Sequence, residues 1–212
     1  MKSYNSLQSL DTAIEQAAGV ICGGKIVLAS ASPRRQELLE RIGITDFEVR
    51  VPQADESYPQ QLTPQEIVCH ISRNKSLALA SAEDEVVITA DTMVFLDDKR
   101  LGKPADEAEA LAMLTALQGR CHTVCTGVTV RQGEHILTQA ASTAVYFRAA
   151  SQKELLAYIR GGEPMDKAGA YGVQGQGSLL VERIDGDFFN VMGLPVVLLS
   201  RMLQQFGISL LD

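Results

Sequence analysis

The sequence predicts an α/β fold: a mixed, elongated and twisted sheet flanked by helices, with two lobes around a central cleft. Helix and strand patterns alternate through the first half of the chain, which is typical of parallel strands joined by helices. In the second half, two long alternating segments at 122–130 and 136–147 meet at Gly133 and indicate an antiparallel hairpin. Because both patterns occur in one chain, the sheet is expected to contain parallel and antiparallel strands.

The bulk composition is that of one folded domain. The chain has 212 residues, of which 46% are hydrophobic and 21% charged, so a full core can be buried. A net charge of −7 argues against a protein that binds nucleic acid over its surface. A small anion could still bind where basic residues converge.

Sequence features also argue against zinc, a catalytic triad and a membrane span. None of the four cysteines forms a C-x-x-C pair and the three histidines are scattered. No stretch approaches the roughly 20 apolar residues of a spanning helix, and we expect a cytoplasmic protein with reduced thiols. Residues 1–24 lack the features of a secretory signal and place apolar residues at helical spacing, so they predict an amphipathic helical extension before a single domain at 25–212.

The first elements follow from capping and turn residues. A short buried-type strand at 25–30 precedes a helix from Pro33 to about Ile42, with Ser32 as its cap and Gly43 after its end. Further along, the sequence predicts a strand at 47–52, a helix from the capping box at 63–66 to about Ala82, and a strand at 86–89 ending at Ala90-Asp91-Thr92.

The remaining elements are punctuated by glycines and a second capping box. The sequence predicts a strand and return at 93–104 with a turn at Asp97-Asp98, and then a helix at 107–117 ended by Gly119. After the two hairpin strands it predicts a helix from Ser151 to about Arg160 and a glycine-rich loop at 161–177. A hairpin-like segment at 178–191 and a last helix from Pro195 to Gly207 complete the chain.

Two arginines stand where a helix is least favourable for them. Arg34 and Arg35 occupy the first turn of the helix, where a cation costs roughly 0.3–1 kcal/mol. The free N–H groups there and two guanidinium groups form an anion site if a ligand binds at the end of the first strand. A solvated surface pair is the alternative. No Walker A or dinucleotide fingerprint matches the sequence.

Carboxylates supply the second signal. Asp91 follows an apolar strand, where it could be a metal ligand or general base, or an ordinary turn residue. The acidic loop offers Asp55 and Glu56 as second carboxylates. Such a sparse set suits magnesium, which prefers one or two carboxylates plus substrate phosphates.

Basic residues and a glycine-rich segment complete the candidates. Lys75 lies on an apolar helix stripe, so it either extends its amine to solvent or points at a ligand. Lys103 is held in a tight Gly-Lys-Pro segment. Glu163, Asp166 and Lys167 lie among glycines, which indicates either a shaped binding loop or a flexible surface loop.

Taken together, these stretches resemble the Maf family of nucleoside triphosphate pyrophosphatases. In family order they are LASASPRRQELLERIGI, ADESYP, ISRNKSLA, ITADTMV, LGKP, GRCHTVCTGV and GEPMDKAGAYGVQGQGSLLVERIDGDFFNVMGLP. The resemblance begins at Lys25 and runs almost to the C-terminus. The leader before Lys25 departs from the family, whose members usually open at that first strand.

The resemblance implies an activity, a fold and an assembly. It implies hydrolysis of a nucleoside triphosphate to the monophosphate and pyrophosphate with a divalent metal, Mg²⁺ or Mn²⁺. It also implies the Maf/ITPase-like α/β fold with a cleft, commonly as a homodimer. The stretch AGAYGVQGQG resembles the branch that acts on dTTP and UTP, whereas the sister branch for 7-methyl-GTP has the form AGSFxxEG there.

The resemblance also implies residue roles. The family's proton acceptor corresponds to Asp91, and its substrate-selecting positions to Arg34, Thr92 and Gln174. We expect Arg34, Arg35, Lys75 and Lys103 to bind triphosphate oxygens, with Arg35 as the plain phosphate binder. Glu56 and Asp91 would hold the metal, and Ser32 and Lys167 would contact substrate. Neither arginine is expected to be needed for the stability of the ligand-free fold.

Three alternatives remain open at this level. One is a nucleotide-sensing regulator of cell division without turnover, since the family is linked by name to septum formation. Another is a pyrophosphatase for other nucleotides, such as 7-methyl-GTP or damaged purine triphosphates. The third, a nucleic-acid binder, is disfavoured by the −7 charge.

Overall fold

The computed structural model describes residues 24–211. The amphipathic helix expected at 1–24 therefore lies outside the described residues, apart from Gly24. The helices and strands are β1 (Ile26–Leu28), α2 (Pro33–Arg41), β2 (Phe47–Val49), α3 (Pro64–Leu77), β3 (Val86–Leu96), β4 (Lys99–Leu101), α4 (Glu107–Leu117), β5 (Cys121–Gln132), β6 (His135–Phe147), α5 (Gln152–Arg160), β7 (Val181–Asp185), α6 (Phe188–Met192) and α7 (Val196–Gln204). Three short 3-10 helices, Glu163–Asp166, Ala168–Ala170 and Gln176–Leu180, occupy the glycine-rich segment.

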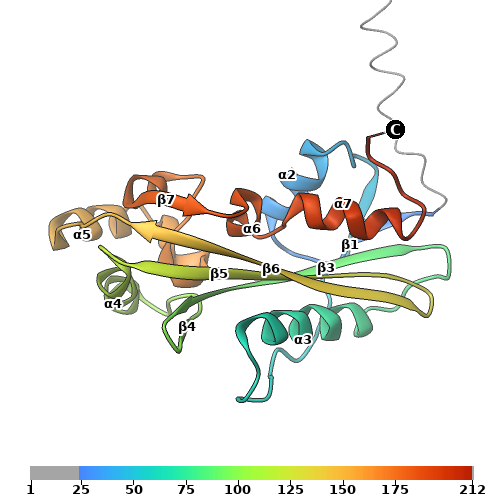
Figure 1. Ribbon diagram of the computed structural model, residues 1–212, viewed down its shortest axis with the longest axis horizontal. Coiled ribbons are helices and arrows are strands. Elements are labelled where there is room, and N and C mark those ends of the chain that lie inside the picture. The colour runs from blue at the N-terminus through green and yellow to red at the C-terminus, as the bar shows by residue number, and fades with distance from the viewer. Residues whose placement is uncertain (1–23, 212) are drawn as a thin grey trace, which may run out of the picture.

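The predicted mixed sheet is confirmed. Its seven strands run in the order β2-β1-β3-β5-β6-β7, with β4 paired to β3. β1 pairs in parallel with β2 and β3, whereas β3, β5, β6 and β7 pair antiparallel in succession. The three long strands β3, β5 and β6 run lengthwise through the molecule, and helices pack at both of its ends (Figure 1).

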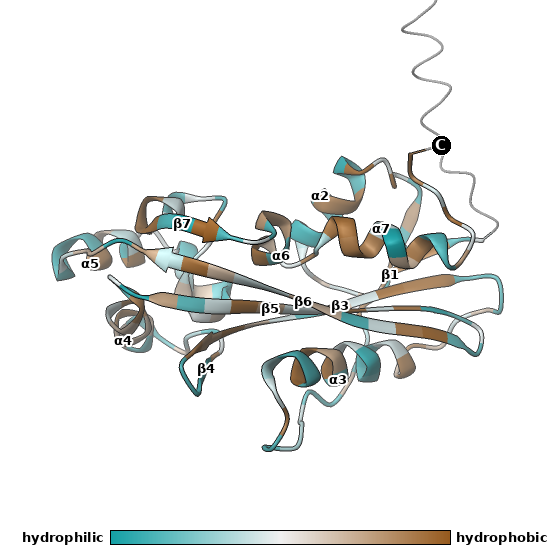
Figure 2. Cartoon of the chain, viewed as in Figure 1, coloured by the Kyte–Doolittle hydropathy of each residue, from teal (hydrophilic) through white to brown (hydrophobic). Residues whose placement is uncertain are grey.

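Helices cover the sheet on both faces. At one end α3 lies on one face, and α2 and α7 lie on the opposite face (Figure 1). At the other end α4 and α5 pack together beside β7. Figure 2 shows hydrophobic residues along α7, which contacts β5 and β6. The main core includes Leu28, Ile88, Leu114, Leu155 and Leu199, and a smaller core under α3 includes Ile67, Ile71 and Phe95.

Local signals placed most helix ends correctly. The capping boxes at Thr63 and Ser151 both form, and Gly43 has the positive φ of 89° that a left-handed residue after a helix needs. Ser32 stands at the N-cap of α2, but its side chain makes no cap hydrogen bond. The predicted capping bond of Ser32 is therefore wrong, and Ser30 Oγ instead accepts from Ser32 N at 3.2 Å.

Two predicted elements end at other residues than expected. β3 does not end at Asp91 but continues to Leu96, because it pairs with β5 along this whole stretch. α3 ends at Leu77 rather than near Ala82, where Arg131 donates to the carbonyls of Ser76 (2.9 Å) and Leu79 (2.7 Å). These bonds satisfy carbonyls at the end of the helix without another helical turn.

The hairpin expected at 178–191 is also wrong. Its first half forms β7, which pairs with β6 rather than with the residues that follow. Its second half is the short helix α6, started by the Asp187 side chain, which accepts from Phe189 N at 2.8 Å. The strand expected at 47–52 is shorter than predicted, ending at Val49 before Pro52, which has no N–H for a sheet ladder.

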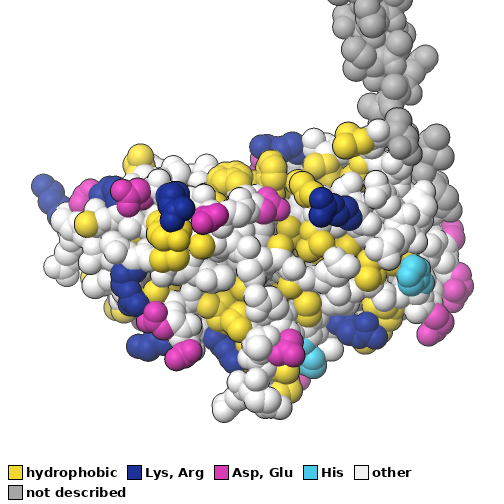
Figure 3. Space-filling model, in the orientation of Figure 1, with side chains coloured by type: hydrophobic (Ala, Val, Ile, Leu, Met, Phe, Trp, Pro, Cys, Tyr) yellow, Lys and Arg dark blue, Asp and Glu magenta, His cyan; other side chains and the backbone are white. Residues whose placement is uncertain are grey.

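None of the described helices could cross a membrane, and the face seen in Figure 3 carries charges of both signs. Across the part of the chain that the structure describes, none of the helices has both the length and the apolar character needed to cross a membrane. On the face seen in Figure 3, basic and acidic side chains are intermingled rather than gathered in one basic patch.

Candidate active site

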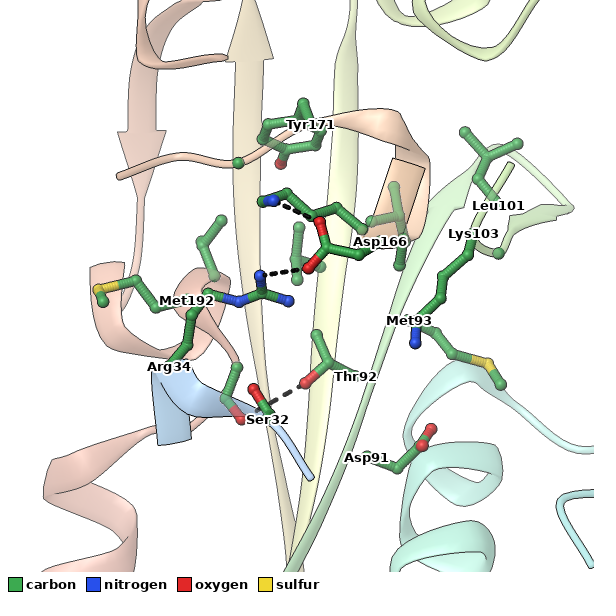
Figure 4. Close-up of a pocket in the computed structure, with 18 of the residues that line it drawn as sticks. Ser32, Arg34, Asp91, Thr92, Met93, Leu101, Lys103, Asp166, Tyr171 and Met192 are labelled. Atoms are coloured by element: carbon green, nitrogen blue, oxygen red, sulfur yellow. Dashed lines mark hydrogen bonds and ion pairs between the residues drawn. The ribbon is translucent and has the colours of Figure 1, made fainter. Parts of the chain in front are cut away.

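All ten of the predicted site residues line one cavity of about 510 Å³. The cavity lies between the start of α2, the middle of β3, the segment 166–174 and the turn after α6 (Figure 4). These residues are Ser32, Arg34, Arg35, Glu56, Lys75, Asp91, Thr92, Lys103, Lys167 and Gln174. Segments far apart in the sequence are thus brought together, and each residue's role stays a prediction.

Asp91 is a buried carboxylate in the middle of β3. Only 7% of the residue is exposed, and its Oδ1 atom accepts from Lys75 Nζ at 2.7 Å. Among the described residues its other oxygen, Oδ2, is buried and has no hydrogen-bond partner. A buried acceptor without a partner costs free energy, so this oxygen can accept a hydrogen bond or coordinate a cation.

Lys75 joins two carboxylates across the cavity. Its ammonium lies 2.7 Å from Asp91 Oδ1 and 2.8 Å from Glu56 Oε1. The Lys75 side chain is 16% exposed and the Glu56 side chain 61%. The alternative that Lys75 extends into solvent is therefore wrong, because its amine is held inside the site.

A glycine in β5 makes this contact possible, and the sequence reasoning missed it. Gly127 pairs with Asp91 across the antiparallel ladder. A Cβ atom at position 127 would lie only 2.3 Å from the carbonyl oxygen of Val68 in α3. Only glycine lets α3 approach the sheet this closely, and this approach brings Lys75 to Asp91.

The guanidinium group of Arg35 donates most of its hydrogen bonds to groups of the protein. Its Nε donates to Gly193 O at 2.9 Å, and its Nη1 donates to Ala90 O at 2.9 Å and Ser30 Oγ at 3.1 Å. Its Nη2 donates to Thr92 Oγ1 at 3.1 Å. Burial lowers the pKa of the guanidinium and the charge of Asp91 opposes that shift. Four of the five N–H groups of an arginine are thus engaged, so the geometry does not favour Arg35 as the plain phosphate binder.

Arg34 has a much looser environment. Its Nη1 lies 3.2 Å from Asp166 Oδ2, with side chains 27% and 64% exposed. Figure 4 shows the two groups facing each other across the cavity. Lys167 also contacts the Asp166 carboxylate. An exposed ion pair of this kind is easily exchanged for a bound anion.

Lys103 and Gln174 are exposed residues that line the cavity. Within the described residues neither makes a side-chain hydrogen bond, and Lys103 makes no ion pair. Lys103 and Asp91 approach the same side of the cavity from opposite directions (Figure 4). Both Lys103 and Gln174 are therefore available to a ligand.

The carboxylates fit a divalent metal that arrives with substrate. Of the two candidates in the acidic loop, Glu56 lines the cavity, whereas Asp55 accepts from Ser57 N at 2.8 Å and Ser57 Oγ at 2.7 Å. Over residues 24–211 no group of three or more His, Cys, Asp or Glu side chains could hold a metal ion alone. Glu56 and Asp91 supply two carboxylates, and Oδ2 of Asp91 has no other partner. Magnesium is commonly bound by one or two carboxylates together with substrate phosphates.

An aromatic cluster under the cavity was not predicted. Tyr171 lines the cavity, and its hydroxyl lies 2.8 Å from His122 Nε2. His122 packs edge-on against Phe147 and Tyr171, with ring centroids 5.0 and 5.4 Å away. Burial lowers the pKa of His122 to about 4, so the imidazole is neutral at pH 7. A scattered histidine carries no local signal for such a role.

Comparisons with known proteins identify relatives of this chain. A family model described as "Maf-like protein" matches residues 25–206. A relative from Exiguobacterium sibiricum named "dTTP/UTP pyrophosphatase" is 47% identical over 184 residues, which cover 87% of this chain and 93% of that protein. A relative of the same name from Caldicellulosiruptor bescii is 45% identical over 194 residues, 88% of this chain and 97% of that protein. A nucleoside-triphosphatase structure from Mycobacterium abscessus has 14% identity and a TM-score of 0.37 over 58% of this chain and 74% of that chain, too weak a likeness for an argument.

Proposed function

Because this chain belongs to the Maf family, we propose that it hydrolyses nucleoside triphosphates, dTTP and UTP foremost, to the monophosphate and pyrophosphate. The chain is an enzyme of the nucleoside triphosphate pyrophosphatase class. The observation that carries the proposal is the buried, unpartnered Oδ2 of Asp91 in a cavity that six basic side chains line. Such a cavity offers a base for water and cations for phosphate oxygens.

Asp91 acts as the proton acceptor in this proposal. It takes a proton from a water molecule whose oxygen forms a bond to the α-phosphorus. The bond between the α-phosphorus and the bridging oxygen breaks, and pyrophosphate leaves with that oxygen. Lys75 holds the carboxylate in place through its 2.7 Å contact and compensates its charge.

The cations around the cavity neutralise the triphosphate. Phosphoanhydride cleavage depends mainly on positioning and charge neutralisation. Arg34 and Lys103 contact phosphate oxygens, and Ser32 adds a hydroxyl donor beside the start of α2. Arg35 acts mainly by fixing Thr92 and the surrounding backbone. A divalent metal held by Asp91 and Glu56 would supply further charge neutralisation at the phosphates.

Gln174 selects the base. A pyrimidine with a 4-oxo group and N3–H presents an acceptor beside a donor, which a side-chain amide can match. Cytosine inverts both groups, and a mismatched pair costs about 1–3 kcal/mol. We therefore expect dTTP and UTP to be preferred over dCTP.

The test is to incubate the protein with dTTP and Mg²⁺ or Mn²⁺ in heavy-oxygen water and to identify the products by mass spectrometry. The proposal expects dTMP carrying the heavy oxygen and unlabelled pyrophosphate. Label in pyrophosphate would refute attack at the α-phosphorus. No product from any common nucleotide would favour the non-catalytic regulator, and a higher kcat/KM for 7-methyl-GTP or a damaged purine would change the substrate.

Asp91→Asn is the sharpest variant for the proposed base. The neutral side chain retains the shape and should retain much of the nucleotide binding while losing most turnover. Pyrophosphate release and dTTP affinity are measured side by side, with chelation of the metal by EDTA as a separate arm. A near wild-type rate in the variant would exclude Asp91 as the base.

Some expectations lie beyond these observations. The homodimer, the cytoplasmic location and the single-domain boundary at 25–212 stay predictions. Analytical ultracentrifugation of the full chain at micromolar concentration tests the dimer directly.

A further inference from the structure

We propose that Glu163 is a positioning residue for base recognition, because its carboxylate and the Tyr158 hydroxyl together fix the loop that presents Gln174 to the cavity. We call residues 172–177 the recognition loop. The inference rests on the proposed function, since it assigns the loop to the selection of the nucleobase. Glu163 itself does not line the cavity, so it acts through the loop.

The Glu163 carboxylate binds the end of the recognition loop. Its Oε2 accepts from Gln176 N at 2.8 Å, and its Oε1 accepts from Gly177 N at 3.2 Å. Two successive backbone N–H groups thus converge on one carboxylate. Charge-assisted bonds of this kind are stronger than bonds between neutral groups, so this end of the loop is well fixed.

Tyr158 in α5 binds both Glu163 and the start of the loop. Its hydroxyl donates to Glu163 Oε1 at 2.9 Å and accepts from Gly172 N at 3.1 Å. Burial raises the pKa of Tyr158 above its usual range, so the phenol keeps the proton that it donates. The loop is therefore held at both ends by one pair of side chains, with Gln174 between the two points of attachment.

The glycines of the loop are explained by this contact. A Cβ atom at Gly175 would lie 2.2 Å from Glu163 Oε2, and one at Gly177 would lie 2.7 Å from the Tyr158 hydroxyl. A Cβ atom at Gly172 would lie 2.9 Å from Glu163 Oε1. The G-x-x-G-x-G spacing, which does not form a dinucleotide site, lets the loop wrap around Glu163 and Tyr158.

Glu163 is also linked to the phosphate side of the cavity. Lys167 Nζ donates to the Glu163 carbonyl oxygen at 2.8 Å and contacts the Asp166 carboxylate. Asp166 in turn pairs with Arg34 at 3.2 Å. The segment around Glu163 thus connects the proposed phosphate ligand Arg34 with the loop that carries Gln174.

Glu163→Gln tests the proposal with little change in shape. A side-chain amide has one acceptor oxygen and two donors, so it places a donor against one of the two loop N–H groups. We expect the ratio of kcat/KM for dTTP over dCTP to fall about ten-fold, mainly through a higher KM for dTTP. Tyr158→Phe removes the hydroxyl and should shift the ratio in the same direction.

Glu154→Gln is the matched control. Glu154 lies in the first turn of α5, the helix that carries Tyr158. Its carboxylate accepts from Ser151 N and Ser151 Oγ, both at 2.8 Å, and from Arg148 Nη2 at 2.9 Å. Its loss weakens the helix cap without touching the recognition loop. A variant that only destabilises the protein lowers the rate on both nucleotides equally, so Glu154→Gln should leave the ratio unchanged.

Two further measurements decide whether Glu163 acts through Gln174. In a Gln174→Ala background, adding Glu163→Gln should change the ratio no further. Hydrogen exchange should show faster exchange of the Gln176 and Gly177 amides in Glu163→Gln than in the control, and this readout needs no activity. An unchanged ratio and unchanged exchange would overturn the inference, whereas a wild-type protein that hydrolyses no nucleotide would refute the proposed function instead.

Discussion

Replacing Arg35 with methionine should, contrary to the expectation from the sequence, destabilise the ligand-free protein, whereas the same change at its neighbour Arg34 should not. Methionine keeps an unbranched apolar stem and removes the guanidinium. Arg35 bonds to the buried carbonyls of Ala90 and Gly193 at 2.9 Å each and to the hydroxyl of Thr92. Arg34 has one ion pair, to the exposed Asp166.

The magnitude follows from the groups that lose their partner. Two buried carbonyls without a donor cost roughly 1–3 kcal/mol each, partly offset because the buried guanidinium no longer has to be desolvated. We therefore expect Arg35→Met to lower the free energy of unfolding by about 2–4 kcal/mol, or Tm by roughly 5–15 °C for a chain of this size. Arg34→Met should change it by less than about 1 kcal/mol.

The assay is urea unfolding of the ligand-free variants at pH 7, followed by far-ultraviolet circular dichroism, with thermal unfolding as a second measure. Equal midpoints for Arg35→Met and wild type would refute the reasoning. So would a loss in Arg34→Met as large as that in Arg35→Met. In either case the hydrogen bonds of Arg35 would not be the reason for its burial.

Two further predictions concern residues outside the proposed chemistry. Burial lowers the folded-state pKa of His122 to about 4 from an ordinary value of 6.5. The unfolded chain therefore binds a proton more readily than the folded one, so the free energy of unfolding falls as the pH is lowered from 6.5 towards 4. His122→Gln should remove roughly 3 kcal/mol of this pH dependence, measured by urea unfolding between pH 7 and 4; parallel profiles for variant and wild type would contradict it. Gly127→Ala should lower the free energy of unfolding by about 1–3 kcal/mol and slow dTTP hydrolysis, because a Cβ 2.3 Å from the Val68 carbonyl forces α3 away from the sheet. Gly102→Ala, with open space around its Cβ position, should unfold like wild type, and equal stability of both variants would argue against the close packing of α3.

The sequence predicted correctly those helix starts that depend on neighbouring residues. The capping boxes at Thr63 and Ser151 set helix starts because donor and acceptor lie three residues apart. The prediction failed where the partner is distant. The end of α3 depends on Arg131, which lies more than 50 residues away. The structure of residues 178–191 depends on the pairing of β7 with β6.

The membership of the candidate site was also predictable, since all ten proposed residues line one cavity. Individual residue types at strand ends and helix starts indicated an anion site, and the resemblance to the Maf family joined them. Gly127, Tyr158 and His122 were missed at the level of the sequence. Each of them contacts residues that are distant in the sequence, so no local pattern indicates its role. A glycine or tyrosine carries no local sign of the backbone that approaches it.

The sequence by itself determined the mixed α/β fold, the start of α2 and the presence of two arginines there. Only the tertiary structure decided that these arginines differ. Arg34 faces an exposed carboxylate and is free to bind a ligand, whereas Arg35 bonds to carbonyls 55 and 158 residues further along the chain. The physical reason is that each residue of an α-helix is rotated by about 100° from the one before it. Arg34 therefore faces Asp166, while Arg35 reaches Ala90 and Thr92 in β3.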